Sequence, residues 1–451
     1  MTTGRKNLAD RTNACAIGNS KHGKVEKFGR PTFGEIFQDL HFEAVIDPQN
    51  PQSLQLHSRD RTRFLTSQQI EHRGQVYMPA KFPEGLSQIV RFPPPSTEFS
   101  SPQKLTESMS EFFCNFGKTP KNDSDLLAAF ALSTCVVDCF RVAPALHLTG
   151  SSTRVHLMTR LLGCLCWHPI LLGHLDLASL STLPKRLNPT LLVHEEKLVN
   201  NVARILETSR NRDLAIPFGK SWIHAYGAKV LFSDSMSVKA SELRIHLAPT
   251  AGALPELKED VEEAIAADFQ AKLLRYRLEY LNRVRDSNFD YSNFNPDVQD
   301  NARALLTPLG DCNELRESVL TSLRFQNKEV AGARFTDLDC LVVEAALTFC
   351  HDPSKEAVFV QEMADVVNAI LSGRHEDQTA TSKAVGQALR GFGLAAERVT
   401  RGYRIDLTNS NREKIHRLAE EHDVPSIKDG IERCDHCQPR EDSGSEMRPG
   451  I

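Results

Sequence analysis

Short runs of apolar residues, each followed by a polar turn, dominate the middle of the chain. Residues 145–150 form an apolar run that ends in glycine, residues 151–154 are polar, and residues 155–166 are apolar on one helical face. Residues 190–195 form a second apolar run that ends in a His-Glu-containing tip. This pattern predicts a buried strand, a glycine turn, a helix and a further buried strand.

The same pattern continues on both sides of this stretch. Apolar runs at 170–172, 228–232 and 243–247 predict three more strands. Strands that alternate with helices favour a mainly parallel sheet between helix layers. Residues 100–141 show the three- and four-residue spacing of helices, and residues 257–325 do so again after the sheet. We therefore expect an α/β fold with helical regions around a parallel sheet.

The region 337–406 has a different order of elements. Its pattern predicts a helix, a short strand, a second helix, a third helix capped by Ser382, and two strands joined by an Arg401-Gly402 turn. This is the order of a winged helix-turn-helix, in which the third helix enters the major groove of DNA and the hairpin touches the backbone. Winged helices also bind proteins, and residues 337–365 are acidic, so both kinds of partner remain open.

Gln can recognise adenine, and Arg can recognise guanine or phosphate. The candidate nucleic-acid-binding residues on the third helix and the hairpin are Lys383, Gln387, Arg390, Arg398, Arg401 and Arg404.

These patterns divide the chain into six parts. They are a disordered arm (1–29), a small α+β appendage (30–98), a core (99–255), a helical lid or linker (256–330), a winged helix-turn-helix (331–424) and a disordered tail (425–451). Within the appendage, residues 31–40 have the pattern of a short helix, and Arg73-Gly74 has the composition of a turn between strands.

The strand-turn-helix stretch is the layout of a P-loop nucleotide-binding core. A working P-loop reads G-x-x-x-x-G-K-[ST]: backbone N–H groups surround the phosphates, the lysine reaches them and the hydroxyl holds Mg²⁺. Counted from Gly150, the chain has Val155 for the second glycine, His156 for the lysine and Leu157 for the hydroxyl. Valine resists positive φ, histidine is shorter than lysine and mostly neutral, and leucine cannot ligate a metal. The layout is kept and the chemistry is lost.

The tip of the second strand shows the same loss. His194 stands where an aspartate would position the metal, and Glu195 stands where an acid would polarise water. Glu195 is a catalytic candidate only if the core hydrolyses ATP. The remaining candidates of a degenerate nucleotide site in these two stretches are Gly150, Ser151, Ser152, Thr153, Arg154, His156 and His194.

Five phrases within residues 86–426 carry a resemblance to a known family. They are SQIVRFPPP, LLAAFALSTCVVDCFRVAPALHLTG, LLGCLCWHPILLGHLDLASL, NPTLLVHEE and VVNAILSGR…SKAVGQALRGFGL. This region resembles the P-loop (AAA+/RecA-like) helicase-type ATPases of bacterial mobile elements, which are similar to the helicase half of phage and plasmid primase-helicases. The resemblance implies a polar sensor at Ser233 and, at Arg244, an arginine that would offset charge on a transferred phosphoryl group. Members of the family carry a GKT-type loop and a DE pair, where this chain has STRVHL and HE.

Composition limits which partners and which location can be expected for the chain. The 451 residues carry a net charge of -4, so attraction to nucleic acid requires a local basic patch. The N-terminus has no apolar signal segment, and the apolar stretch 161–172 is shorter than the ~20 residues of a membrane helix. We therefore expect a cytoplasmic protein without a membrane partner. The 11 cysteines are expected as reduced thiols; Cys434 and Cys437 form half of a zinc motif whose other half is not visible, so no metal is predicted.

Three hypotheses follow. The favoured one is a catalytically degenerate P-loop ATPase-like protein, without cofactor, that serves as a DNA-binding or scaffold component related to mobile-element helicases. The second is a divergent but active DNA-dependent ATPase or helicase that binds ATP and Mg²⁺. It would hold phosphate through the helix N-terminus and the backbone of residues 151–154, with Arg154 or an arginine from another subunit replacing the lysine. The third is a protein-interaction module of a replication or mobile-element complex that does not bind DNA. A homo-oligomer is open in each, because the resembled helicases form rings.

Overall fold

The computed structural model describes residues 29–60, 63–81, 85, 89–184, 186–195, 200–219, 221–223, 225–232, 243–249, 253–334, 337–352, 354–374, 376, 378–422 and 424. Ser233, most of the predicted arm, the predicted tail and its two cysteines lie outside the described residues.

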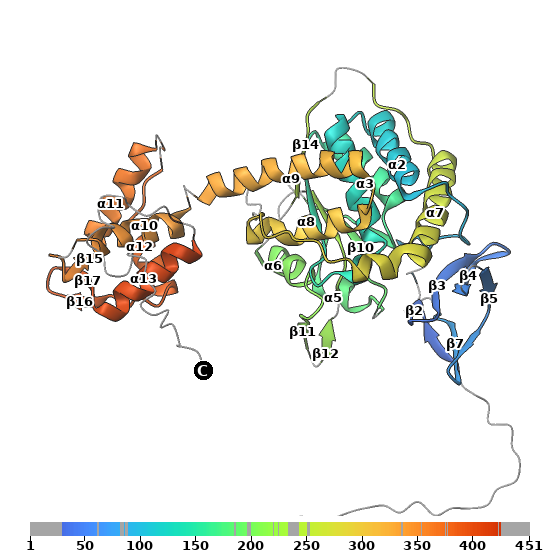
Figure 1. Cartoon of the computed structure of the whole chain (residues 1–451), viewed down its shortest axis with the longest axis horizontal. Coiled ribbons are helices and arrows are strands. Elements are labelled where there is room, and N and C mark those ends of the chain that lie inside the picture. The colour runs from blue at the N-terminus through green and yellow to red at the C-terminus, as the bar shows by residue number, and fades with distance from the viewer. Residues whose placement is uncertain are drawn as a thin grey trace, which may run out of the picture.

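Five parallel strands form the central sheet, which helices enclose (Figure 1). Their order across the sheet is β14–β8–β13–β10–β9. The strands are β8 (Ala145–Gly150), β9 (Pro169–Leu172), β10 (Thr190–His194), β13 (Lys229–Phe232) and β14 (Leu243–Leu247). The predicted α/β fold with a parallel sheet flanked by helices is confirmed.

Both faces of the sheet are buried. Neighbouring residues on a strand point to opposite faces, and Leu191 and Leu192 of β10 belong to two different apolar clusters. The larger cluster includes the helices α2 (Pro102–Gly117), α3 (Lys121–Thr134), α4 (Ser152–Leu165), α7 (Glu259–Asp286), α8 (Pro296–Leu309) and α9 (Asn313–Arg334). The other includes α5 (Leu177–Ser181) and α6 (Asn200–Thr208) together with N-terminal strands. Because each strand is a continuous apolar run, it presents apolar side chains to the helices on both faces of the sheet.

The first strand of the sheet lies in its interior. The chain leaves β8 through α4 toward β9 at the far edge, whereas it leaves β13 in the opposite direction and crosses β8 to reach β14. In open α/β sheets, ligands bind beyond the carboxyl ends of strands where the connections diverge in this way. A ligand-binding site is therefore expected at the carboxyl ends of β8, β13 and β10.

Seven N-terminal strands form two small sheets. One is β2–β3–β4–β5 and the other is β1–β7–β6. Their bounds are β1 (Arg30–Thr32), β2 (Gly34–Ile36), β3 (His41–Asp47), β4 (Asn50–Asp60), β5 (Arg63–Ser67), β6 (Ile70–His72) and β7 (Gln75–Pro79).

The helix predicted at residues 31–40 is wrong. Pairing of β2 with β3 and burial of Phe33 against the core override the local helical spacing. The predicted turn is present: Arg73 and Gly74 join β6 to β7 with φ of 50° and 77°.

The C-terminal elements follow the predicted order. They are α10 (Leu338–Cys350), β15 (Ala357–Phe359), α11 (Val360–Gly373), α12 (Ser382–Gly391), β16 (Glu397–Val399), β17 (Gly402–Asp406) and α13 (Asn409–Glu421), the last of which was not predicted. The three strands pair antiparallel in the order β15–β17–β16, and the unit has its own apolar cluster. The cap of α12 is Thr381 instead of Ser382: the Thr381 hydroxyl accepts from the Ala384 amide, and the Ser382 hydroxyl donates to Gln361.

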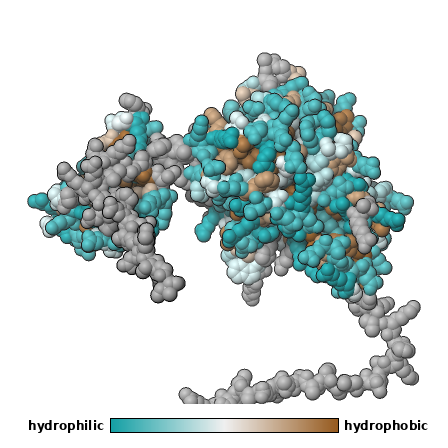
Figure 2. Space-filling model, viewed as in Figure 1, coloured by the Kyte–Doolittle hydropathy of each residue, from teal (hydrophilic) through white to brown (hydrophobic). Residues whose placement is uncertain are grey.

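The surface seen in Figure 2 is mainly hydrophilic, with apolar residues in small groups over the core. No helix within the described ranges is long and apolar enough to cross a membrane.

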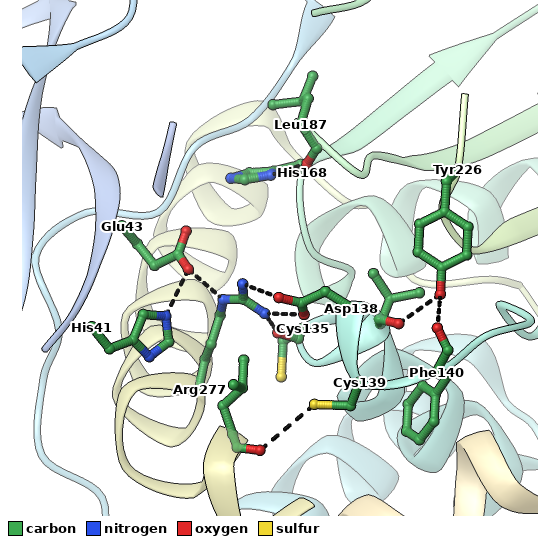
Figure 3. Close-up of polar contacts among 12 residues, drawn as sticks. His41, Glu43, Cys135, Asp138, Cys139, Phe140, His168, Leu187, Tyr226 and Arg277 are labelled. Atoms are coloured by element: carbon green, nitrogen blue, oxygen red, sulfur yellow. Dashed lines mark hydrogen bonds and ion pairs between the residues drawn. The ribbon is translucent and has the colours of Figure 1, made fainter. Parts of the chain in front are cut away.

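A buried ion cluster joins the N-terminal strands to the core (Figure 3). The Arg277 guanidinium on α7 donates to Glu43 of β3 at 2.8 Å and to both carboxylate oxygens of Asp138 at 2.7 and 2.9 Å. His41 Nε2 lies 2.8 Å from the Glu43 carboxylate. Arg277 is 6% exposed and Glu43 is 4% exposed. The cluster therefore links β3, α7 and the short 3-10 helix Val137–Cys139 inside the protein.

We predict that Arg277→Met lowers the free energy of unfolding by about 3–5 kcal/mol, because two carboxylates stay buried without their cation. Urea denaturation measures this change. Arg283→Gln is the control on the same helix: its ion pair with Asp311 is exposed, so the expected loss is below about 1 kcal/mol. Equal losses in the two variants would contradict the assigned role of Arg277.

The pH dependence gives a second readout. Burial alone would raise the pKa of Glu43 and Asp138, but the adjacent Arg277 charge lowers both below their ordinary values of 4.5 and 3.8. Such groups stabilise the fold above the unfolded pKa, and this contribution is lost as pH falls through the folded pKa. Without Arg277 burial dominates and the two pKa values rise, so the variant gains stability on acidification. The stability gap between wild type and Arg277→Met should therefore narrow from about pH 7 to pH 4.

Candidate functional site

The junction between β8 and α4 has almost no loop. Helix α4 begins at Ser152, so only Ser151 separates it from Gly150. The polar turn predicted at residues 151–154 is wrong, because Ser152, Thr153 and Arg154 form the first helical turn. The Val155 amide already donates to the Ser151 carbonyl at 2.9 Å. A phosphate-wrapping loop needs non-helical residues and a second glycine with positive φ. Without that glycine, the chain enters the helix at once.

Gly150 has a structural role at the tip of β8. Its φ is 109°, and an added Cβ would lie 2.3 Å from the Leu247 carbonyl oxygen of β14. The amide of Ser151 donates to this same carbonyl at 3.0 Å. The glycine at this strand tip is thus required for close passage of two backbones.

Arg154 is built into the core. The residue is 7% exposed, and its guanidinium donates to the carbonyls of Gly117 and Lys118, both at 2.9 Å, and to the carbonyl of Ala248. These carbonyls belong to the end of α2 and to the segment after β14. In this arrangement Arg154 links the end of α2 to the segment after β14, and its guanidinium is not available to bind a phosphate.

Three other candidates gather at the carboxyl edge of the sheet. His156 is exposed on α4, and its ring lies 6.4 Å from the ring of His194 at the end of β10. The ring of His194 stacks on Phe232 at 4.5 Å. Glu195 follows, and its Oε1 lies 3.1 Å from Nδ1 of His174, which was not among the predicted site residues. Two buried atoms here, His194 Nε2 and Glu195 Oε2, have no hydrogen-bond partner among the described residues.

The side chains at this edge are therefore imidazoles and a carboxylate. None of them is a lysine that could bind a phosphate. Within the described ranges, no group of three or more His, Cys, Asp or Glu side chains is arranged to hold a metal ion.

Arg244 lies away from this edge. It is opposite His147 in the pairing of β14 with β8, three residues before the level of Gly150. At a rise of ~3.3 Å per residue, that is roughly 10 Å along the sheet. Its side chain is exposed. The other candidate implied by the resemblance, Ser233, is outside the described residues.

A hairpin that the apolar pattern did not predict extends from the sheet region (Figure 1). Strands β11 (Ile216–Phe218) and β12 (Ser221–Ile223) pair antiparallel, with Gly219 at a φ of 57° in the turn. Ile216 and Ile223 anchor the hairpin in the core, whereas Trp222 is 63% exposed. The signal was present as a Gly-Lys pair between short apolar runs. An exposed tryptophan can stack on a nucleobase.

Five of the six C-terminal candidates are exposed, and four of these five are cations. Lys383, Gln387 and Arg390 are exposed on α12, while Val385 and Leu389 of the same helix are buried. Arg398 of β16 and Arg401 of the turn are also exposed. The side chains of these five exposed residues make no hydrogen bond or ion pair with any residue that the structure describes.

Arg404 differs from this set. It is half-buried on β17, and its Nε lies 3.0 Å from the Asp406 carboxylate. The contact is an ion pair whose geometry does not make it a hydrogen bond. The charge of Arg404 is therefore compensated within the unit.

Comparison with known proteins gives only distant likenesses. No protein-family model and no curated protein sequence matches the chain. Among solved structures, the apo A form of the NrS-1 C-terminal region is similar at 10% identity and a TM-score of 0.33, covering 81% of this chain and 97% of that one. Drosophila ORC bound to DNA is similar at 12% identity and a TM-score of 0.20, covering 72% of this chain and 95% of that one. Likeness at this level assigns no activity to the chain.

We predict that ATP and ADP with Mg²⁺ show no saturable binding up to about 1 mM in calorimetry, because the wrapping loop is absent and Arg154 is engaged elsewhere. Phosphate release should stay at background in wild type. It should be the same in Glu195→Gln and in Glu259→Gln, a control at an exposed position of α7. Mg²⁺-dependent binding, with turnover lost only in Glu195→Gln, would show that the site is active.

Proposed function

We propose that this chain is a catalytically degenerate P-loop ATPase-like protein that binds DNA through its C-terminal unit, as a component related to mobile-element helicases. In this proposal residues 99–255 are the degenerate core, residues 256–330 a helical lid and residues 331–424 a winged helix-turn-helix. The observation that carries the proposal is the set of exposed, uncompensated cations on α12 and the hairpin.

The geometry of α12 supports insertion into the major groove. Lys383, Gln387 and Arg390 are spaced by four and three residues, so they share one face of the helix. The opposite face is anchored by Val385 and Leu389, both fully buried. A recognition helix needs two such faces: one that packs against its own domain, and one whose polar side chains can hydrogen-bond to DNA. Gln387 has the donor and acceptor pair that recognises adenine.

The hairpin supports contact with the DNA backbone. In a winged helix the hairpin touches the phosphates beside the groove. Arg398 and Arg401 are exposed on this hairpin, and a guanidinium binds phosphate oxygens with two parallel N–H donors. Such contacts position the protein on the duplex without sequence recognition.

Ion pairing distinguishes these cations from Arg404, the remaining candidate of the unit. A cation that already has an internal ion pair gains little from a phosphate, whereas an unpaired cation displaces condensed counterions. Because the chain as a whole is slightly acidic, the free set on α12 and the hairpin would provide the local attraction. Arg404 is expected to contribute least among the six candidates, since Asp406 pairs with it.

The core supports a role without hydrolysis. The early start of α4 and the engagement of Arg154 remove the route by which a divergent ATPase would hold phosphate. The hypothesis of an active DNA-dependent ATPase therefore has less support than a scaffold that carries a DNA-binding unit.

We predict that Lys383→Ala and Arg401→Ala each weaken binding to about two helical turns of duplex DNA in fluorescence anisotropy. Each lost phosphate contact should reduce the slope of log K against log salt by about 0.9. Arg404→Ala should change affinity less, because its charge is already paired. Arg141→Ala is the control on the core, where the exposed guanidinium pairs with Asp213 at 2.8 Å.

Two outcomes would overturn the proposal. DNA binding that is unaffected by all changes on α12 and the hairpin would place the interface elsewhere. Absence of DNA binding would favour the hypothesis that the unit binds a protein partner.

A further inference from the structure

Two metal-ligating side chains meet in the C-terminal unit, where α10 packs against α13. The Sγ atom of Cys340, on the first turn of α10, lies 3.5 Å from Nδ1 of His422, the residue that caps the end of α13. Cys340 is 6% exposed and His422 is half-buried. Both helices contribute to the apolar cluster of the unit, so their packing holds the two side chains together.

The spacing of this pair fits two ligands of one tetrahedral zinc ion. Zinc binds a cysteine sulfur at ~2.3 Å and a histidine nitrogen at ~2.0–2.1 Å, and a tetrahedral angle places these two atoms roughly 3.6 Å apart. The observed 3.5 Å also fits an S–H···N hydrogen bond in the metal-free chain. Zinc displaces the proton of such a bond, because the thiolate is the ligand. The fold therefore presents two donor atoms at the separation that one ion requires.

A structural zinc site has four ligands, and the described part of the chain supplies two. No group of three or more His, Cys, Asp or Glu side chains in that part could hold a metal ion. The sequence contains the other half of such a site, since Cys434 and Cys437 have the Cys-x-x-Cys spacing that binds one zinc ion. These two cysteines lie outside the described residues, so their contribution is inferred from the sequence.

The length of chain between the two halves allows them to meet. Cys434 follows His422 by 12 residues, and a chain of this length can span up to roughly 40 Å when extended. A spacer of about this length also separates the two halves of common zinc motifs, which have roughly 12–15 residues between them. The order along the chain therefore fits a single site.

We propose that Cys340, His422, Cys434 and Cys437 bind one Zn²⁺ ion as a structural site with three cysteine ligands and one histidine ligand. The ion fixes the chain that follows α13 to the first turn of α10. A site with four protein ligands is closed to substrate, so it stabilises the unit and carries no reaction. The proposal does not depend on DNA binding, because neither α12 nor the hairpin supplies a ligand.

The test uses the 451-residue chain with its thiols reduced, titrated with Zn²⁺ in competition with a chelating dye. Cys340→Ser and His422→Gln each remove one ligand of the described pair, and Cys434→Ser removes one from the other half. His416→Gln is the matched control: His416 is also half-buried on α13, but its ring lies 5.4 Å from that of His351. Co²⁺ in place of Zn²⁺ reports tetrahedral thiolate coordination through its visible absorption.

We expect tight binding of a single Zn²⁺ ion by wild type and by His416→Gln. Each of the three ligand variants should weaken binding at least roughly tenfold, since removal of a group that only orients a ligand already costs about 10–100-fold. The absence of tight zinc binding by wild type overturns the proposal, as does wild-type affinity in either Cys340→Ser or His422→Gln. An equal loss in His416→Gln would contradict the assigned ligands. If Cys340→Ser does not fold, His422→Gln and Cys434→Ser decide the outcome.

Discussion

The buried guanidinium of Arg277 is the interaction on which the arrangement of the N-terminal half depends. It joins β3, the segment after α3, and α7. Glu43, Asp138 and Arg277, which supply the contacts, are each more than 90 residues apart in the sequence. Without it, burial would raise the pKa of both carboxylates and so disfavour their ionised forms. This cluster fixes the N-terminal strands against the core.

At the carboxyl edge, a different constraint decides the chemistry. The sheet provides the diverging connections at which α/β proteins bind ligands. A phosphate-binding loop must stay non-helical over several residues between strand and helix, and this requires a second glycine. The chain has Val155 there, and α4 already begins at Ser152, three residues before it. The polar residues of the expected loop then become a helical turn, and Arg154 is drawn into contact with three backbone carbonyls.

Much of the fold could be predicted from the pattern of apolar residues. The parallel strands, the buried helix α3 and the order of C-terminal elements follow from local periodicity, because each element buries one face or both. The start of α4 could not be predicted, since Ser-Ser-Thr-Arg is as typical of a turn as of a helix start. The strand at residues 34–36 was missed because pairing with β3 outweighs its local preference.

The candidate site was predictable only in part. His156, His194 and Glu195 meet at one edge because the ends of parallel strands meet there. The partners of Arg154 are 36, 37 and 94 residues away in sequence, so its role depends on packing that periodicity does not show. The same holds for Cys340 and His422, which are 82 residues apart in the chain and meet because α10 packs against α13.

A degenerate core implies that DNA binding by this chain is independent of nucleotide. It can be tested by measuring the affinity of the 451-residue chain for duplex DNA with and without saturating ATP and Mg²⁺, at one fixed salt concentration. We expect measurable DNA binding with the same dissociation constant in both conditions. A change of about tenfold or more on adding ATP would show a coupling free energy between the two sites, and would contradict a degenerate core.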